Sequence, residues 1–140
     1  GSCLAGIAFL KGLGLVHAIS HMVGAECDTH HGLTNAVVLP VVLRYNEPAI
    51  AHKLGPMSAA MGLETRDFAG LLAAVEGLID LCAVPRGLAE LGVTGGQIPS
   101  IARKAVKDVA ATTNPRPASL AEIEALIRAA MTETRPLRNA

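Results

Sequence analysis

The stretch that decides the fold runs from Gly12 to Pro40 and reads GLGLVHAISHMVGAECDTHHGLTNAVVLP. Its first part belongs to a longer segment, Leu4 to Val23, that is apolar almost all round and so predicts a helix buried on every side. Gly24 to His31 is polar, which predicts a loop. Leu33 to Leu43 is apolar again and predicts a second buried helix, kinked at Pro40 because proline lacks a backbone donor. Two buried helices should therefore bracket a polar loop.

The composition favours helices along the rest of the chain as well. The 140 residues are 51% hydrophobic and 17% charged, which excludes a disordered segment and is enough for one domain with a core. Alanine and leucine, both strong helix formers, are the commonest residues. No run alternates between polar and apolar residues for long enough to form a sheet. We therefore expect an all-α bundle of about six to seven helices over residues 1–140.

Four amphipathic stripes beyond Asn46 predict helices over 50–61, 68–82, 98–109 and 119–131. The second stripe is the most regular, whereas Gly55-Pro56 makes the first irregular. Asn114-Pro115-Arg116-Pro117 predicts a rigid connector before the last helix, and Ser119 with Glu122 three residues later is a capping box. The last helix should turn four apolar side chains inward: Leu120, Ile123, Ile127 and Met131.

Charge and cysteine content exclude several classes of protein. The chain has twelve basic and twelve acidic residues and only three aromatic ones, so neither a basic patch nor a stacking platform for nucleic acid is present. The three cysteines are odd in number and far apart, which is typical of reduced thiols in a cytoplasmic protein. The N-terminal apolar run ends at Lys11, too short to span a bilayer. We expect a cytoplasmic protein that binds neither nucleic acid nor a membrane.

Histidines are concentrated where the first predicted helix meets the polar loop. Four of the five lie between positions 17 and 31, and His17 and His21 are four residues apart, so they share one face of a helix. Imidazoles bind zinc, iron and nickel, and such an ion inside an apolar bundle would act as a Lewis acid. The pattern is not that of a zinc protease, because Ala18 stands where the general-base glutamate would be. For His52, alone on a polar stretch, we expect no functional role.

The residues from Gly12 to Pro40 resemble the C-terminal-domain signature of the iron-containing (group III) alcohol dehydrogenases. In that signature a G-x-x-H-x-x-x-H helix is followed by an H-G-x-x-N-A-x-x-L-P helix, and both patterns occur here. The resemblance implies an all-helical domain that pairs with an N-terminal α/β nucleotide-binding domain, with metal and nicotinamide in the cleft between them. Residues 1–140 would then be the single helical, metal-binding half of the enzyme, and the nucleotide-binding domain is absent from this chain.

The resemblance also implies roles for individual residues. His17 and His31 match two metal ligands of the family, and His21 matches a histidine beside the nicotinamide and substrate, so we assign it a catalytic and cofactor-binding role. The other two family ligands belong to an Asp-x-x-x-His motif that this chain lacks, as it lacks the Gly-rich nucleotide loop. Met22 and His30 stand where the family has prolines, and His30 is an alternative donor to His31.

Five further polar residues have a more ordinary expected role. Cys27 and Asp28 lie in the predicted loop that should face the substrate, where we expect an inert buried thiol and a turn residue; the alternative is that either one lines the pocket. Thr34 and Asn35 should hold backbone in place rather than touch substrate. Arg116 should be a helix-end or interdomain partner.

The function implied by the resemblance is that of a metal-dependent, NAD- or NADP-linked alcohol dehydrogenase, which interconverts an alcohol and an aldehyde or ketone by hydride transfer. We expect the metal to be Fe²⁺, with Zn²⁺ as the second choice. It would lower the pKa of the alcohol, and His21 would orient the substrate or relay its proton. This chain alone should be inactive, and the surface that faces the missing domain should promote homo-oligomers. Substrate, cofactor and metal stay open.

Two alternatives remain. The first is a non-enzymatic helical module whose histidines form a structural or vestigial metal site. The second keeps the fold but has the activity of a maleylacetate reductase or a glycerol dehydrogenase. A tight, stoichiometric zinc ion bound by His17, His21 and His31 together would favour the module.

Overall fold

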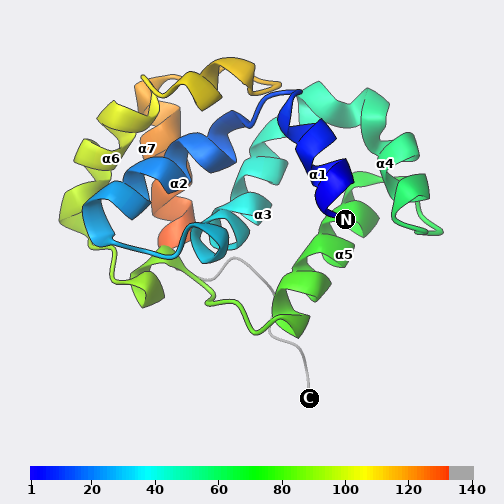
Figure 1. Cartoon of the computed structure of the whole chain (residues 1–140), viewed down its shortest axis with the longest axis horizontal. Coiled ribbons are helices and arrows are strands. Elements are labelled where there is room, and N and C mark those ends of the chain that lie inside the picture. Colours follow the sequence, from blue (N-terminus) through cyan, green and yellow to red (C-terminus); the bar gives the residue numbers. More distant parts are fainter. Residues whose placement is uncertain (133–140) are drawn as a thin grey trace.

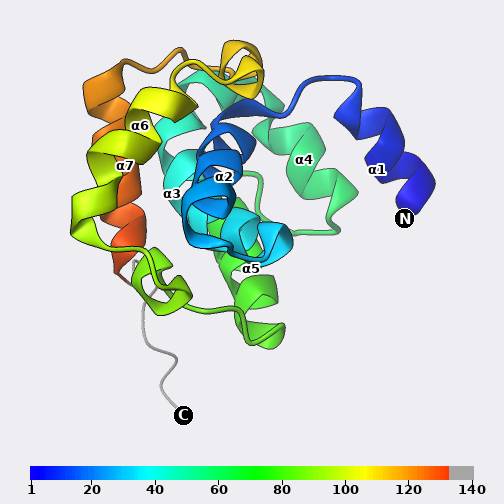
Figure 2. The same ribbon diagram turned by 60° about the vertical axis from the view of Figure 1, so that its left-hand side comes forward.

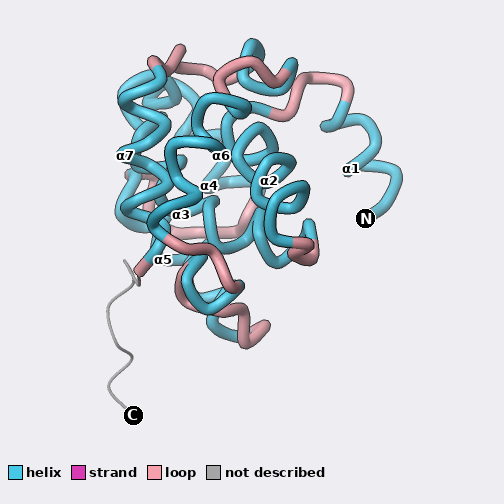
Figure 3. The backbone as a smooth tube through the Cα atoms, turned by 90° about the vertical axis from the view of Figure 1, so that its left-hand side faces the viewer, coloured by secondary structure: helices cyan, strands magenta, loops and turns pink. Residues whose placement is uncertain are grey.

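The structure is a computed structural model that describes residues 1–132. This part of the chain consists of helices and connecting loops, with no strand (Figure 3). The all-α prediction is confirmed. The α-helices are α1 (Ser2–Phe9), α2 (Gly14–Cys27), α3 (His31–Ile50), α4 (Leu54–Ala60), α5 (Phe68–Leu81), α6 (Ile98–Ala105) and α7 (Leu120–Met131). Short 3-10 helices are η1 (Ala51–Lys53), η2 (Leu88–Leu91), η3 (Gly95–Gln97) and η4 (Val109–Thr113).

Helix α2 is the centre of the bundle. It packs against α3, α6 and η4, while α7 closes the far side by packing on both α3 and α6 (Figure 1). Helices α4 and α5 pack on each other, and α5 also packs on α3. Because α2 has neighbours on several sides, much of its apolar surface is buried.

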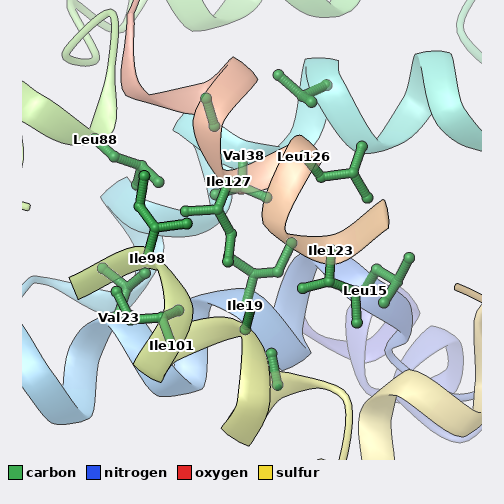
Figure 4. Packing of buried hydrophobic residues seen from close by; sticks show 14 of the residues in the cluster. Leu15, Ile19, Val23, Val38, Leu88, Ile98, Ile101, Ile123, Leu126 and Ile127 are labelled. Atoms are coloured by element: carbon green, nitrogen blue, oxygen red, sulfur yellow. The ribbon is translucent and has the colours of Figure 1, made fainter. Parts of the chain in front are cut away.

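The core lies between α2, α3, α6 and α7 (Figure 4). Helix α2 contributes Leu15, Ile19 and Val23, which are spaced four residues apart and are at most 1% exposed. They meet a small set of fully or almost fully buried side chains from the other elements: Val38, Leu88, Ile98, Ile101, Ile123, Leu126 and Ile127. Burying each such side chain stabilises the fold by roughly 1.5–3 kcal/mol. This packing holds α2 and the start of α3 in place.

The prediction of one buried helix from Leu4 to Val23 is wrong. The segment forms two helices, α1 and α2, whose axes are bent by 98°. Gly12 lies between the two helices with φ of 94°, and Gly14 is the first residue of α2 with φ of 75°. This left-handed conformation suits glycine and interrupts a right-handed helix. Helix α1 has no buried residue and stands apart from the bundle (Figure 2).

No single helix of the described part is long and apolar enough to cross a membrane. Taken together, the bent pair of α1 and α2 has the length and composition of a membrane span, and these two properties alone are what it shares with one.

The predicted polar loop is shorter than expected. Helix α2 continues to Cys27, and only Asp28 to His30 separate it from α3. Asp28 ends α2 in the left-handed conformation at φ 51°, so the chain turns back at once. Helix α3 then runs through Pro40 and Pro48 to Ile50, well beyond the predicted end at Leu43. The short turn brings the first residue of α3 back beside α2.

Of the other predicted helices, 68–82 and 119–131 are confirmed as α5 and α7. The helix predicted over 98–109 ends at Ala105, and the one predicted over 50–61 is divided between the end of α3, η1 and α4. The capping box of Ser119 and Glu122 opens α7 as expected. Val109 was expected on the inner stripe of the third of these helices, but it lies beyond α6 and is 81% exposed. Leu120 is 38% exposed because it is the first residue of α7. Glu76, off the predicted stripe, is buried because α3 supplies Arg44 as its partner.

The connector that begins at Asn114 fixes the start of α2. No side chain next to α2 in sequence caps this helix. Instead the Asn114 Oδ1 accepts a hydrogen bond from the Leu15 backbone N–H at 3.1 Å. Asn114 also exchanges two hydrogen bonds with Asn46 of α3, at 3.1 and 2.7 Å. A buried amide pair thus ties α2 and α3 to the predicted connector.

Candidate metal centre

Three imidazole rings gather where α2 faces the start of α3. His17 and His21 lie one turn apart on α2, and His31 is the first residue of α3. The ring centroids are 5.9 Å apart for His17 and His21, 5.3 Å for His17 and His31, and 5.4 Å for His21 and His31. Residues predicted from sequence to share a site are therefore adjacent in space.

The Nε2 atoms of His17 and His31 are directed at one point. The side-chain amide nitrogen of Asn35, one turn along α3 from His31, lies 2.9 Å from Nε2 of His31 and 3.4 Å from Nε2 of His17. An amide N–H can only donate, so both imidazole nitrogens accept. The Nε2 lone pairs of His17 and His31 therefore point to the same position, which is occupied here by the Asn35 amide nitrogen.

Ser20 sets which nitrogen of His31 carries the proton. Its Oγ lies 2.9 Å from Nδ1 of His31 and 3.4 Å from the His31 carbonyl oxygen. The Asn35 amide donates to Nε2, so the proton of the neutral ring is on Nδ1, where Nδ1–H donates to Oγ and the hydroxyl donates to the carbonyl. Nε2 of His31 is left unprotonated, which is the state a metal ligand needs.

His17 is held in the neutral form by its surroundings. Burial lowers its pKa below the ordinary value, and the neighbouring rings of His31 and His21 add to this effect. The backbone of Leu13 and the Asp108 carboxylate act in the opposite sense and are weaker. A neutral imidazole keeps a lone pair available for a cation.

His21 has a carboxylate partner that sequence analysis missed. Its Nδ1 lies 3.1 Å from Oδ2 of Asp108, in the segment between α6 and η4. The two residues are 87 positions apart, so no local pattern indicates the pair. Ser20 was missed because a serine on an apolar helix has no special signal.

Thr34 and Asn35 differ from each other in role. Thr34 is buried; its hydroxyl donates to the His30 carbonyl at 3.2 Å and lies 2.8 Å from the Thr29 hydroxyl, which supports the turn as expected. For Asn35 the expectation of a backbone-holding role is wrong, because its amide contacts two imidazoles. Its i+4 spacing from His31 was a usable signal.

The remaining candidates lie at helix ends or on the surface. His30 caps α3, with Nδ1 accepting from the Leu33 N–H at 3.4 Å. Cys27 accepts a hydrogen bond from Gln97, and burial raises the pKa of its thiol. Asp28 is the C-cap of α2, and His52 is exposed in η1.

Arg116 ties two parts of the same bundle together. Its guanidinium lies 4.0 Å from the centroid of the Tyr45 ring and donates to the Tyr45 carbonyl at 3.2 Å. It also pairs with Glu122 at the start of α7. The helix-end role expected for Arg116 is therefore present.

Two apolar hollows open beside the histidines. One of about 430 Å³ is lined by Ala5, Ala8, Phe9, Gly12, Leu13 and His17. The other, of about 230 Å³, is lined by Phe9, Gly12, Leu13, His21, Val109, Ala110 and Thr113. A small organic molecule fits spaces of this kind, with a histidine as the polar group in the wall of each.

The described residues contain no group of three or more His, Cys, Asp or Glu side chains arranged to hold a metal ion. The converging donors are the two Nε2 atoms of His17 and His31. A tetrahedral site needs further ligands.

Comparison with known proteins adds an independent finding. The sequence profile of the "Fe-containing alcohol dehydrogenase family, C-terminal" matches residues 1–131. The chain is 40% identical to 1,3-propanediol dehydrogenase of Klebsiella pneumoniae over 136 residues, covering 92% of this chain and 35% of the relative. It is 36% identical to lactaldehyde reductase of Escherichia coli K12 over 137 residues, covering 93% and 36%.

A solved structure is similar as well. The crystal structure of a 1,3-propanediol oxidoreductase superposes with a TM-score of 0.77 at 39% identity, covering 84% of this chain and 32% of that one. The chain spans about a third of the length of the relatives it matches.

Proposed function

The chain belongs to the iron-containing alcohol dehydrogenase family, and from this premise we propose that it is the metal-binding half of an NAD- or NADP-linked alcohol dehydrogenase. An N-terminal nucleotide-binding domain would supply the dinucleotide and the remaining metal ligands. The reaction would interconvert a small alcohol and its aldehyde or ketone by hydride transfer. We place this enzyme in the cytoplasm, as a homo-oligomer.

The observation that carries the proposal is the convergence of Nε2 of His17 and Nε2 of His31 on the Asn35 amide. These two atoms fit a divalent ion for three reasons. Both are imidazole donors, burial favours the neutral form of His17, and Ser20 leaves Nε2 of His31 unprotonated. Such an ion, Fe²⁺ or Zn²⁺, supplies Lewis-acid polarisation of an alcohol or carbonyl oxygen when bound.

The residues around the rings would orient the substrate. The carbon skeleton of a small alcohol fits the apolar hollow formed by Phe9, Leu13 and Val109. His21 lies in the wall of the same hollow, where its imidazole can hold the substrate hydroxyl and relay the proton.

Replacement of His31 by alanine in the full-length enzyme tests this function. We expect bound metal and turnover both to fall steeply, because one of the two converging donors is lost. His52→Ala is the matched control, since that exposed histidine lies in η1 away from the cluster. Unchanged metal content and turnover in His31→Ala would remove the assignment. Tight metal binding that needs all three clustered histidines, without turnover, would favour a structural site instead.

A further inference from the structure

We propose that Asp108 is a positioning residue that holds His21 in a single tautomer, with the proton on Nδ1 and the lone pair on Nε2. The catalytic consequence of this tautomer rests on the proposed function.

The Asp108 side chain is held in place by a contact that does not involve His21. It is the N-cap of η4, where its Oδ1 accepts a hydrogen bond from the Ala110 N–H at 2.8 Å. Its side chain is 12% exposed, and η4 packs against α2. One carboxylate oxygen is therefore committed to the backbone, and the other, Oδ2, is directed at α2.

The contact with His21 defines the donor and the acceptor. Oδ2 of Asp108 lies 3.1 Å from Nδ1 of His21. An ionised carboxylate can only accept, so Nδ1–H donates. A neutral imidazole has one proton, which leaves Nε2 of His21 as an acceptor.

The His31 ring limits the remaining freedom of His21. The two rings are stacked with an interplanar angle of 15° and a centroid distance of 5.4 Å. The His17 ring meets His21 at 67° from the preceding turn of α2. With Nδ1 hydrogen-bonded to Asp108 and the ring stacked on His31, Nε2 is the remaining acceptor of His21.

This arrangement has a chemical consequence in the proposed reaction. When the substrate O–H bond breaks, Nε2 of His21 takes the proton, and a new N–H bond forms while the ring becomes an imidazolium. The Asp108 carboxylate stabilises that cation across the Nδ1–H contact, as a carboxylate does for the histidine of Ser-His-Asp hydrolases. Solvent then removes the proton, and the reverse sequence serves carbonyl reduction.

Replacement of Asp108 by asparagine separates this role from helix capping. Asparagine caps a helix about as well as aspartate, so the Ala110 contact can persist through its carbonyl oxygen. The amide NH₂ group would then face Nδ1 of His21 and donate to it. We expect the tautomer to invert, with the proton on Nε2.

The measurement is nitrogen NMR of labelled imidazoles in the 140-residue chain, in alkaline solution. Wild type should show Nδ1–H at His21, and Asp108→Asn should show Nε2–H. Asp67→Asn is the matched control, because Asp67 caps α5 by accepting from the Gly70 N–H at 2.8 Å and contacts no histidine through that oxygen. Its spectrum should equal that of wild type. The same His21 tautomer in wild type and Asp108→Asn would overturn the proposal.

Asp108→Glu guards against loss of the fold. It keeps the carboxylate, and recovery of Nδ1–H in this variant would support the assignment, whereas Nε2–H would contradict it. In the full-length enzyme, Asp108→Asn should lower kcat by about 10²-fold or more at unchanged metal content. Inversion of the tautomer with unchanged kcat would leave the positioning intact and overturn the proton role of His21, so the two failures are distinguishable.

Discussion

At the scale of single residues, the candidate site depends on side chains that are not ligands themselves. Ser20 and Asn35 orient His31 from opposite nitrogens, and Asp108 orients His21. Second contacts of this kind fix the ring orientation and the tautomer, which decide whether a lone pair faces a cation. The histidines alone would not define a site.

Ser20→Ala is expected to weaken metal binding by the full-length enzyme about tenfold, because Nδ1 of His31 loses its acceptor. The dissociation constant can be measured by competition with a metal chelator. Ser58→Ala is the control: Ser58 is equally buried, and its hydroxyl has no hydrogen-bond partner in the described part of the chain. Equal affinities for the two variants would show that Ser20 does not orient His31.

Glu26 predicts how stability depends on pH. Its Oε1 accepts hydrogen bonds from Lys104 at 2.8 Å and from Ser100 at 2.6 Å. Both bonds lower the pKa of Glu26 below its ordinary value of 4.5, and the bond from Lys104 has the larger effect. Since the unfolded state binds the proton more readily, this contact stabilises the fold above about pH 4.5 and is lost as pH falls through the folded pKa.

Glu26→Gln should therefore lower the free energy of unfolding at neutral pH by about 1 kcal/mol. The difference from wild type should shrink as the pH falls below about 4.5, through the lowered pKa of folded Glu26. Urea unfolding at a series of pH values measures both effects, with the exposed Glu47→Gln as control. A difference that stays constant down to acid pH would contradict the assignment.

At the scale of elements, the placement of α2 depends on the buried amide pair of Asn46 and Asn114. The pair caps α2 through the Leu15 N–H and links it to α3. Since His17 lies on the first turn of α2, the pair also sets the position of a candidate ligand relative to His31.

Asn114→Ala should destabilise the fold by about 2–3 kcal/mol, because the Leu15 N–H and the Asn46 amide lose a buried partner. Asn46→Ala should be less severe, since the cap of α2 remains. A double-mutant cycle measured by urea unfolding should give a coupling of about 1 kcal/mol between the two residues. Additive effects would show that the two amides act independently.

Many of the helices were predictable from the sequence, and the exceptions have physical reasons. The periodicity of α5 and the capping box of α7 are local signals that correctly predict both helices, although Leu78 of the α5 stripe is 59% exposed. The break between α1 and α2 was missed because the segment is apolar throughout, and backbone conformation at Gly12 and Gly14 outweighs composition. The buried position of Glu76 depends on Arg44 of another helix, which no local pattern reveals.

At the scale of the whole molecule, the bundle presents its histidines next to its least protected element. Helix α1 exposes Leu4, Ile7 and Phe9 at 74%, 55% and 61%, and Phe9 also lines both hollows at the histidines. Exposed apolar surface of this kind usually marks a contact with another chain or domain. We expect the nucleotide-binding domain to cover it in the full-length enzyme.

The histidines that come together were predictable from the sequence, whereas the side chains that hydrogen-bond to them were not. His17, His21 and His31 were predictable because they lie within one short stretch of sequence, where both the helical spacing and the family motif can be recognised. Asp108 was not, since its contact with His21 depends on how η4 packs against α2. Whether His17 and His31 bind metal stays a prediction.

The most direct test of the central claim is a crystal structure of the full-length enzyme loaded with metal, with the ion located by its anomalous scattering. The account predicts one ion bonded to Nε2 of His17 and to Nε2 of His31, at roughly 2.0–2.2 Å from each. Asn35 should have moved its amide away from that point, and His21 should remain uncoordinated. An ion bonded to neither His17 nor His31, or one held by His21 in place of either, would contradict the account.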